Sequence, residues 1–147
     1  LALRGGPGRD ACWVIGLRDP RDEASSARHL GGVALRQGGV ATSGAAWRWW
    51  QRDGQRLHHL VDPRTGRPAT TAGIDPDPQA LVGVTALAQT ATTAEVYAKY
   101  ALLLGMPTCL ATLNRGLDVA GICIMGDGSI IPSTNIYSFL AAHGEQP

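Results

Sequence analysis

Apolar residues fall into short runs along the chain, and most runs have the length of a β-strand. Gly, Pro or Asp lies near an end of most runs, as is typical of strands. The clearest runs cover residues 12–17, 29–36, 55–61, 81–88 and 119–125. The pattern predicts a sheet in which the first two of these strands form a hairpin.

Two turn sequences predict further hairpins. Asp53-Gly54 is a typical two-residue hairpin turn and leads into residues 55–61, which carry His58 and His59. Gly126-Asp127-Gly128 separates residues 119–125 from residues 129–131. Both turns favour antiparallel pairing of strands that are neighbours in sequence.

Helical periodicity is clearest in the second half of the chain. A helix is expected from Thr92 to Gly105, because glycine commonly ends a helix, and a second one over residues 108–115. Thr92 and Glu95 have the spacing of a capping box. Helical spacing predicts a buried stripe of Val96, Tyr100, Leu103 and Leu104.

A shorter helix is expected after the turn at residues 37–39. Thr42 or Ser43 would be the N-cap of a segment that runs to Trp50. Backbone N–H groups and two hydroxyls at a helix N-terminus suit a phosphate or the polar edge of a ring system. Together the elements predict an α+β domain over residues 1–147, a mainly antiparallel sheet packed against helices.

Composition narrows the function classes. The hydrophobic fraction of 44% suffices for a core, while 13 basic against 12 acidic residues leave no electrostatic footprint for nucleic acid or an anionic membrane. No apolar run reaches the length of a membrane span, so no transmembrane segment is expected in this chain. The cysteines are odd in number and widely spaced, which favours buried free thiols at Cys12, Cys109 and Cys123.

Residues 59–68, His-Leu-Val-Asp-Pro-Arg-Thr-Gly-Arg-Pro, carry the densest candidate chemistry. Pro63 biases Asp62 toward extended geometry, and Gly66 can adopt the positive φ of a tight turn. We therefore expect His59 and Asp62 to be presented from a stiff loop. Because adjacent strand residues point to opposite faces, only one of His58 and His59 can face a given site.

Three blocks in this order resemble the ApbE-type flavin transferases. They are Ala41-Thr42-Ser43-Gly44, residues 59–68, and residues 94–99 with Gly105 beyond them. The resemblance implies an ApbE-like, T-fold-related fold of which this chain is the C-terminal half. It also implies the reaction: FMN is transferred from FAD to a threonine of a target protein, with release of AMP and with a magnesium ion at the pyrophosphate.

The resemblance also implies residue roles. His59 would be the general base that accepts the threonine proton, and Asp62 or the nearby backbone would orient its ring. Glu95 would be the metal ligand. The remaining cofactor-binding residues would be Thr42, Ser43, Gly44, His58, Asp62 and Lys99.

Lys99 departs from the family pattern. It lies where the family has a threonine ligand to the metal, and an ammonium has no acceptor atom with which to ligate magnesium. Two readings follow: Lys99 supplies positive charge to the pyrophosphate beside or instead of one metal contact, or the metal site is lost. Lys99 is the only lysine of the chain, which favours a specific role.

Structural readings of the same residues stay open. Glu95 and Lys99 have the i, i+4 order of an ordinary helix ion pair. His59 could be a strand histidine that caps its own turn. Function likewise has two alternatives: a flavin-binding or target-binding module without transfer activity, and a hydrolase that splits FAD into FMN and AMP.

Overall fold

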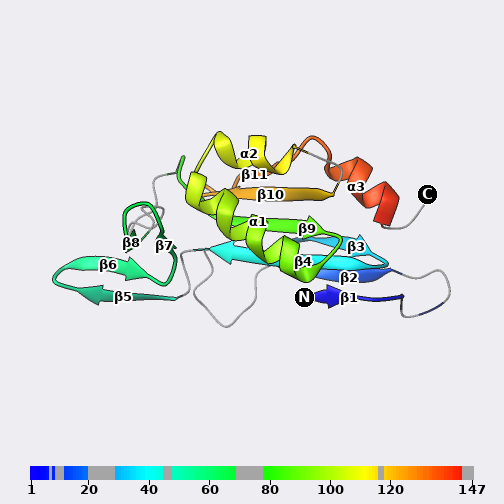
Figure 1. The fold of residues 1–147 in the computed structure, drawn as a ribbon, viewed down its shortest axis with the longest axis horizontal. Coiled ribbons are helices and arrows are strands. Elements are labelled where there is room, and N and C mark those ends of the chain that lie inside the picture. Colours follow the sequence, from blue (N-terminus) through cyan, green and yellow to red (C-terminus); the bar gives the residue numbers. More distant parts are fainter. Residues whose placement is uncertain are drawn as a thin grey trace.

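A five-stranded antiparallel sheet is the centre of the fold (Figure 1). The computed structural model describes residues 1–6, 8, 12–19, 29–44, 48–68, 78–115 and 118–143. The strands lie in the order β1 (Ala2–Leu3), β4 (Gly38–Gly44), β9 (Leu81–Ala88), β10 (Val119–Met125) and β11 (Ile130–Pro132). The central strands β9 and β10 are buried along their whole length, which explains why they read as continuous apolar runs.

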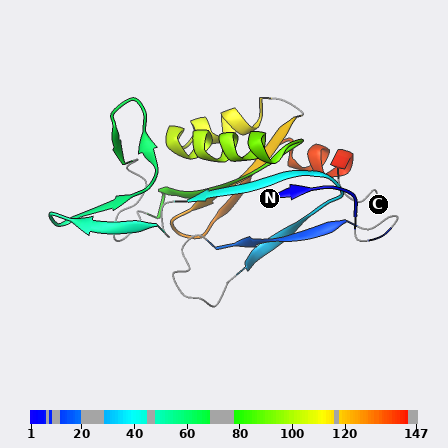
Figure 2. The same cartoon turned by 60° about the horizontal axis from the view of Figure 1, so that its bottom comes forward.

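The sheet is covered on both faces (Figure 2). Helix α1 (Ala91–Leu104) and helix α2 (Thr108–Leu113) cover one face. The hairpin of β2 (Trp13–Arg18) and β3 (His29–Leu35) covers the other face together with helix α3 (Ile136–His143). The molecule therefore has two apolar layers, one on each side of the sheet.

The start of helix α1 lies very close to β4. A Cβ atom added to Gly39 would lie 2.3 Å from the backbone nitrogen of Ala91. The buried face of the helix is formed by Ala94, Ala98, Ala101 and Leu102.

The predicted stripe of α1 is therefore wrong. Val96 is 57% exposed and Tyr100 is 49% exposed. The capping box predicted for Thr92 and Glu95 is also wrong, because the N-cap is Thr90, whose side chain accepts a hydrogen bond from the backbone N–H of Thr93 at 3.1 Å. The end of the helix at Gly105, with φ of 67°, is as predicted.

The short helix predicted from Thr42 or Ser43 to Trp50 is not formed. Residues 38–44 are the strand β4, which pairs antiparallel with β9 from Gly39↔Ala88 to Gly44↔Gly83. Trp50 belongs to a further strand. The buried edge of β9 supplies backbone partners to β4, and this pairing outweighs the local capping preference of the two hydroxyl residues.

Two small ribbons extend from one end of the sheet (Figure 1). In the first, β5 (Trp49–Arg52) pairs with β6 (Gln55–His58) across the predicted Asp53-Gly54 turn, where both residues have positive φ. In the second, β7 (Val61–Asp62) pairs with β8 (Arg67–Pro68). Both ribbons carry residues of the candidate site or its neighbours.

The α+β class and the mainly antiparallel sheet are confirmed. The three cysteines are buried free thiols, as predicted. Contact with the Cys123 thiol, followed by burial, raises the pKa of Cys109 far above its usual range, so this thiol is kept protonated. No helix among the described residues is long and apolar enough to cross a membrane. The charged, Ser- and Ala-rich residues 21–28 and the Thr-, Gly- and Pro-rich residues 69–79 are expected to be loops from their composition. Residues 21–28 and 69–77 lie outside the described residues.

Candidate functional site

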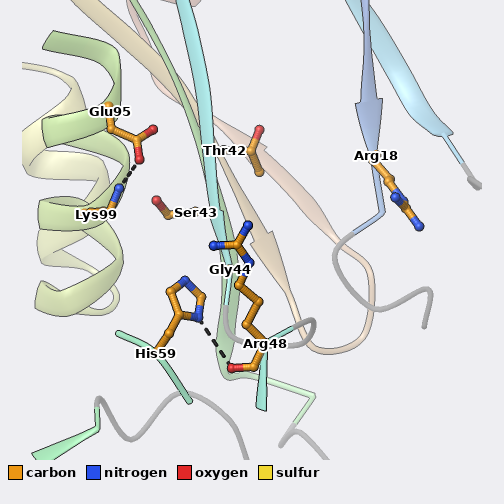
Figure 3. A pocket seen from close by; sticks show the side chains of 8 residues that line it. All are labelled: Arg18, Thr42, Ser43, Gly44, Arg48, His59, Glu95 and Lys99. Atoms are coloured by element: carbon orange, nitrogen blue, oxygen red, sulfur yellow. Dashed lines mark hydrogen bonds and ion pairs between the residues drawn. The ribbon is translucent and has the colours of Figure 1, made fainter. Parts of the chain in front are cut away.

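A cavity of about 400 Å³ lies against the free edge of β4 (Figure 3). Strand β1 pairs only with Gly38 and Gly39, so no described strand covers the edge of β4 over residues 41–44. Helix α1, strand β2 and the ribbon of β5 and β6 reach this edge from different sides. The lining residues are Arg18, Thr42, Ser43, Gly44, Arg48, His59, Glu95 and Lys99.

The hydroxyls of β4 lie on opposite faces of the strand, as its alternation requires. Ser43 is buried on the side of α1, whereas Thr42 lies on the side of β2 (Figure 3). The Oγ1 atom of Thr42 is 2.9 Å from that of Thr85 on the paired strand β9. The cavity thus wraps around the edge of β4, and the predicted residues Thr42, Ser43 and Gly44 all line it without a helix N-terminus.

The α1 wall of the cavity carries Glu95 and Lys99. They lie one helical turn apart, and the Nζ atom of Lys99 donates to Oε1 of Glu95. Both side chains are about half exposed. The ion pair predicted from the i, i+4 spacing is present, and both of its members also face the cavity.

His59 is held by the backbone at the start of β5. The backbone N–H of His59 donates to the carbonyl oxygen of Arg48 at 3.3 Å, and the ring atom Nδ1 lies 3.4 Å from the same oxygen. Because a carbonyl oxygen only accepts, this contact requires the proton on Nδ1. The other nitrogen, Nε2, then carries a lone pair and faces the space beside Ser43 and Lys99 (Figure 3).

His58 and Asp62, predicted to bind the cofactor, do not line the cavity. His58 is 1% exposed, and its Nδ1 atom accepts a hydrogen bond from the backbone N–H of Leu60 at 3.2 Å. His58 is thus buried outside the cavity, and of the two histidines only His59 lines it. Asp62 and the nearby backbone were the two groups expected to orient the His59 ring, and the structure shows the backbone contact.

Asp62 instead stabilises its own turn. Its carboxylate accepts from the backbone N–H of Arg64 at 2.9 Å and from the Arg64 guanidinium at 2.8 Å. These bonds hold the pKa of Asp62 below its ordinary value. Gly66 has the predicted positive φ, and its N–H donates to the Asp62 carbonyl at 2.8 Å.

Two arginines of the cavity, Arg18 and Arg48, were not predicted as site residues. Arg18 ends β2, and Arg48 directly precedes β5. The sequence did offer a signal for Arg48, because a charged residue stands there among three tryptophans. Its position beside the cavity follows only from the strand β5 that comes directly after it.

The cavity is cationic. Arg18, Arg48 and Lys99 face it against the single carboxylate of Glu95. Guanidinium and ammonium groups near hydroxyls and exposed strand amides suit a phosphate-bearing ligand. Among the described residues no group of three His, Cys, Asp or Glu side chains is placed to hold a metal ion.

Comparison with known proteins points to one family. The sequence model of the ApbE family matches residues 1–123. A FAD:protein FMN transferase of Treponema pallidum (strain Nichols) is 33% identical over 141 residues, which cover 92% of this chain and 36% of that protein. The FAD:protein FMN transferase of Escherichia coli (strain K12) is 31% identical over 128 residues, which cover 86% of this chain and 34% of that protein.

Solved structures agree with the sequence comparison. The ApbE protein of Thermotoga maritima matches with a TM-score of 0.72 and 28% identity, over 92% of this chain and 40% of that one. The flavin transferase ApbE of Vibrio cholerae matches with a TM-score of 0.63 and 25% identity, over 95% of this chain and 41% of that one. The chain spans little more than a third of the length of the two transferases above, less than the expected half. With most of its length matched in sequence and in fold, the chain belongs to the ApbE family.

Proposed function

We propose that the protein containing this chain transfers FMN from FAD to a threonine hydroxyl of a target protein and releases AMP. The observation that carries the proposal is His59, whose Nδ1 is fixed on a carbonyl oxygen while Nε2 faces a cationic cavity. Relatives that match most of this chain are named FAD:protein FMN transferase.

The reaction is one displacement at phosphorus. The threonine oxygen attacks the phosphorus of the FMN half of the pyrophosphate, and its proton passes to Nε2 of His59. The bond between that phosphorus and the bridging oxygen breaks, and AMP leaves. The product is a phosphoester between FMN and threonine, and no redox step is needed.

The other lining residues bind the cofactor in this proposal. Ser43 and Thr42 offer hydroxyls, and the edge of β4 near Gly44 offers backbone groups. Lys99 supplies positive charge to the pyrophosphate. His58 and Asp62 are left out of the cofactor set, because they stabilise the backbone outside the cavity.

The residues present fit a magnesium ion that takes most of its ligands from the substrate. Magnesium in phosphoryl-transfer sites is commonly bound by one or two carboxylates, waters and substrate phosphates, and Glu95 is the carboxylate that lines this cavity. When bound, the ion supplies positive charge that offsets the charge gained by the leaving phosphate. Glu95 would hold the ion with a carboxylate whose Oε1 accepts a hydrogen bond from Lys99, so the two cations would share its charge.

A binding module without transfer activity is the second candidate, and the Glu95–Lys99 ion pair favours it. A carboxylate that is already neutralised attracts a metal ion less strongly than a free one. The hydrolase alternative requires only that water replaces threonine.

The test is a transfer assay with the protein that contains this chain, FAD, magnesium and an acceptor peptide. Transfer predicts a flavin-labelled threonine peptide together with one AMP per label, and no label on the same peptide with valine in place of threonine. AMP without label would indicate hydrolysis. FAD binding without either product would indicate the binding module.

A further inference from the structure

Arg48 combines two features within one residue. Its carbonyl oxygen receives both the backbone N–H and the Nδ1 atom of His59. Its side chain extends into the middle of the cavity (Figure 3). A group bound by the guanidinium therefore lies in the same cavity as the His59 ring.

The guanidinium of Arg48 is uncommitted within the part of the chain that the structure describes. It makes no hydrogen bond or ion pair with a described residue, whereas Lys99 is engaged by Glu95. Arg52 is four residues further along the chain and does not line the cavity, and its Nε atom lies 3.7 Å from Oδ2 of Asp53. A cation with no partner among the described residues, beside hydroxyls in a concave site, is placed to bind an anion.

We propose that Arg48 is the phosphate-binding residue of this site, and that its guanidinium binds two oxygens of the pyrophosphate next to His59. The inference rests on the proposed function and names the residue that recognises its substrate. A guanidinium presents two parallel N–H donors that match two phosphate oxygens, which an ammonium does not. The carbonyl of Arg48 meanwhile keeps Nε2 of His59 turned toward the same phosphate.

The test measures binding of inorganic pyrophosphate and of riboflavin, which has no phosphate, by calorimetry. Four proteins are compared: the natural sequence, Arg48→Met, Arg48→Lys and the matched control Arg52→Met. We expect Arg48→Met to weaken pyrophosphate binding by about tenfold or more, because charge-assisted hydrogen bonds are lost. The pyrophosphate affinity of Arg48→Lys should lie between those of the natural sequence and Arg48→Met, because lysine keeps the charge but lacks the two parallel N–H donors. The pyrophosphate affinity of Arg52→Met should stay within about twofold of the natural sequence. Riboflavin binding should be the same in all four.

Two results would overturn the inference. One is pyrophosphate affinity in Arg48→Met equal to that of Arg52→Met; the other is an equal loss of riboflavin and pyrophosphate, which indicates a structural role. If Arg48→Met does not fold, Arg48→Lys decides, and unchanged pyrophosphate affinity in it rejects the two-oxygen contact. Failure of the proposed function looks different: the natural sequence labels no threonine peptide, while pyrophosphate binding still depends on Arg48.

Discussion

The two walls of the cavity handle charge in opposite ways. On the α1 wall, Glu95 and Lys99 neutralise each other across one helical turn. On the opposite wall, His59 is held by a backbone carbonyl, and the Arg48 guanidinium has no partner among the described residues. One wall is electrostatically satisfied without a ligand, and the other is not.

The difference indicates how the work is divided. A ring held by a backbone oxygen keeps its tautomer and orientation whether or not a ligand is bound, as a general base requires. A surface ion pair, in contrast, is worth little in water, so Glu95 and Lys99 can exchange each other for a metal ion and a phosphate at small cost. We therefore expect substitutions of His59 or Arg48, on what we call the His59 wall, to lower the transfer rate. Substitutions on the α1 wall should instead change how the transfer rate depends on magnesium.

The largest effect is expected at His59. His59→Ala should lower the transfer rate by on the order of 10²–10⁴, the usual contribution of a general base, while FAD affinity stays within a few-fold. His59→Asn is the sharper variant, because an amide N–H can still donate to the Arg48 carbonyl but the side chain cannot take up a proton at neutral pH. Transfer rates and FAD titrations of both variants make the measurement. A normal rate in His59→Asn would remove His59 from the base role.

The second effect belongs to Glu95. Glu95→Ala should raise the magnesium concentration needed for half-maximal transfer well above that of the natural sequence. Folding should hardly change, because Glu95 is not part of the N-cap and an exposed i, i+4 pair contributes roughly 0.3–0.5 kcal/mol. Thermal unfolding measures the effect on stability, and a magnesium titration of the transfer rate measures the effect on metal dependence. A large fall in melting temperature with an unchanged magnesium curve would give Glu95 a structural role only.

The strands could be predicted from local signals, whereas the buried face of α1 could not. Residues 81–88 and 119–125 were predicted with the observed bounds, because strands buried on both faces read as unbroken apolar runs. The buried face of α1, which contains Ala94, Ala98, Ala101 and Leu102, depends on how the helix packs on the sheet, and its start is fixed by the close approach of Ala91 to Gly39. Helical spacing alone therefore predicted Val96 and Tyr100 as buried, although they are exposed.

The candidate site was predicted in part for the same reason. His59, Glu95 and Lys99 line one cavity as their motifs implied. Arg48 was not predicted as a site residue, because the segment up to Trp50 was expected to be a helix. The pairing of β5 with β6 places Arg48 beside His59. The position of Arg48 thus depends on strand pairing, which local sequence patterns do not predict.

Lys99 tests the α1 wall more finely. Lys99→Thr removes the ammonium from Glu95 and restores a hydroxyl, so transfer should depend more steeply on magnesium than in the natural sequence. Lys99→Met removes the charge at similar length and should lower the rate, by less than His59→Ala does. Transfer rate against magnesium concentration for all three proteins makes the measurement. Superimposable curves would leave Lys99 as the partner of Glu95 in a helix ion pair and nothing more.

The smallest effect is expected at Asp62, next to the His59 wall but outside the cavity. Its pKa lies below the ordinary 3.8 because Arg64 holds the carboxylate, so the stabilisation is fully present above that value. It is lost as the pH falls through the lower, folded-state pKa. In the natural sequence, hydrogen exchange at the Arg64 amide should therefore lose protection only in that acid range. Asp62→Asn should show weaker protection without this pH dependence, and its transfer rate should stay close to normal because the carbonyl of Arg48 orients His59. A loss of transfer in Asp62→Asn as deep as in His59→Ala would mean that the carboxylate, rather than the backbone, supports the ring.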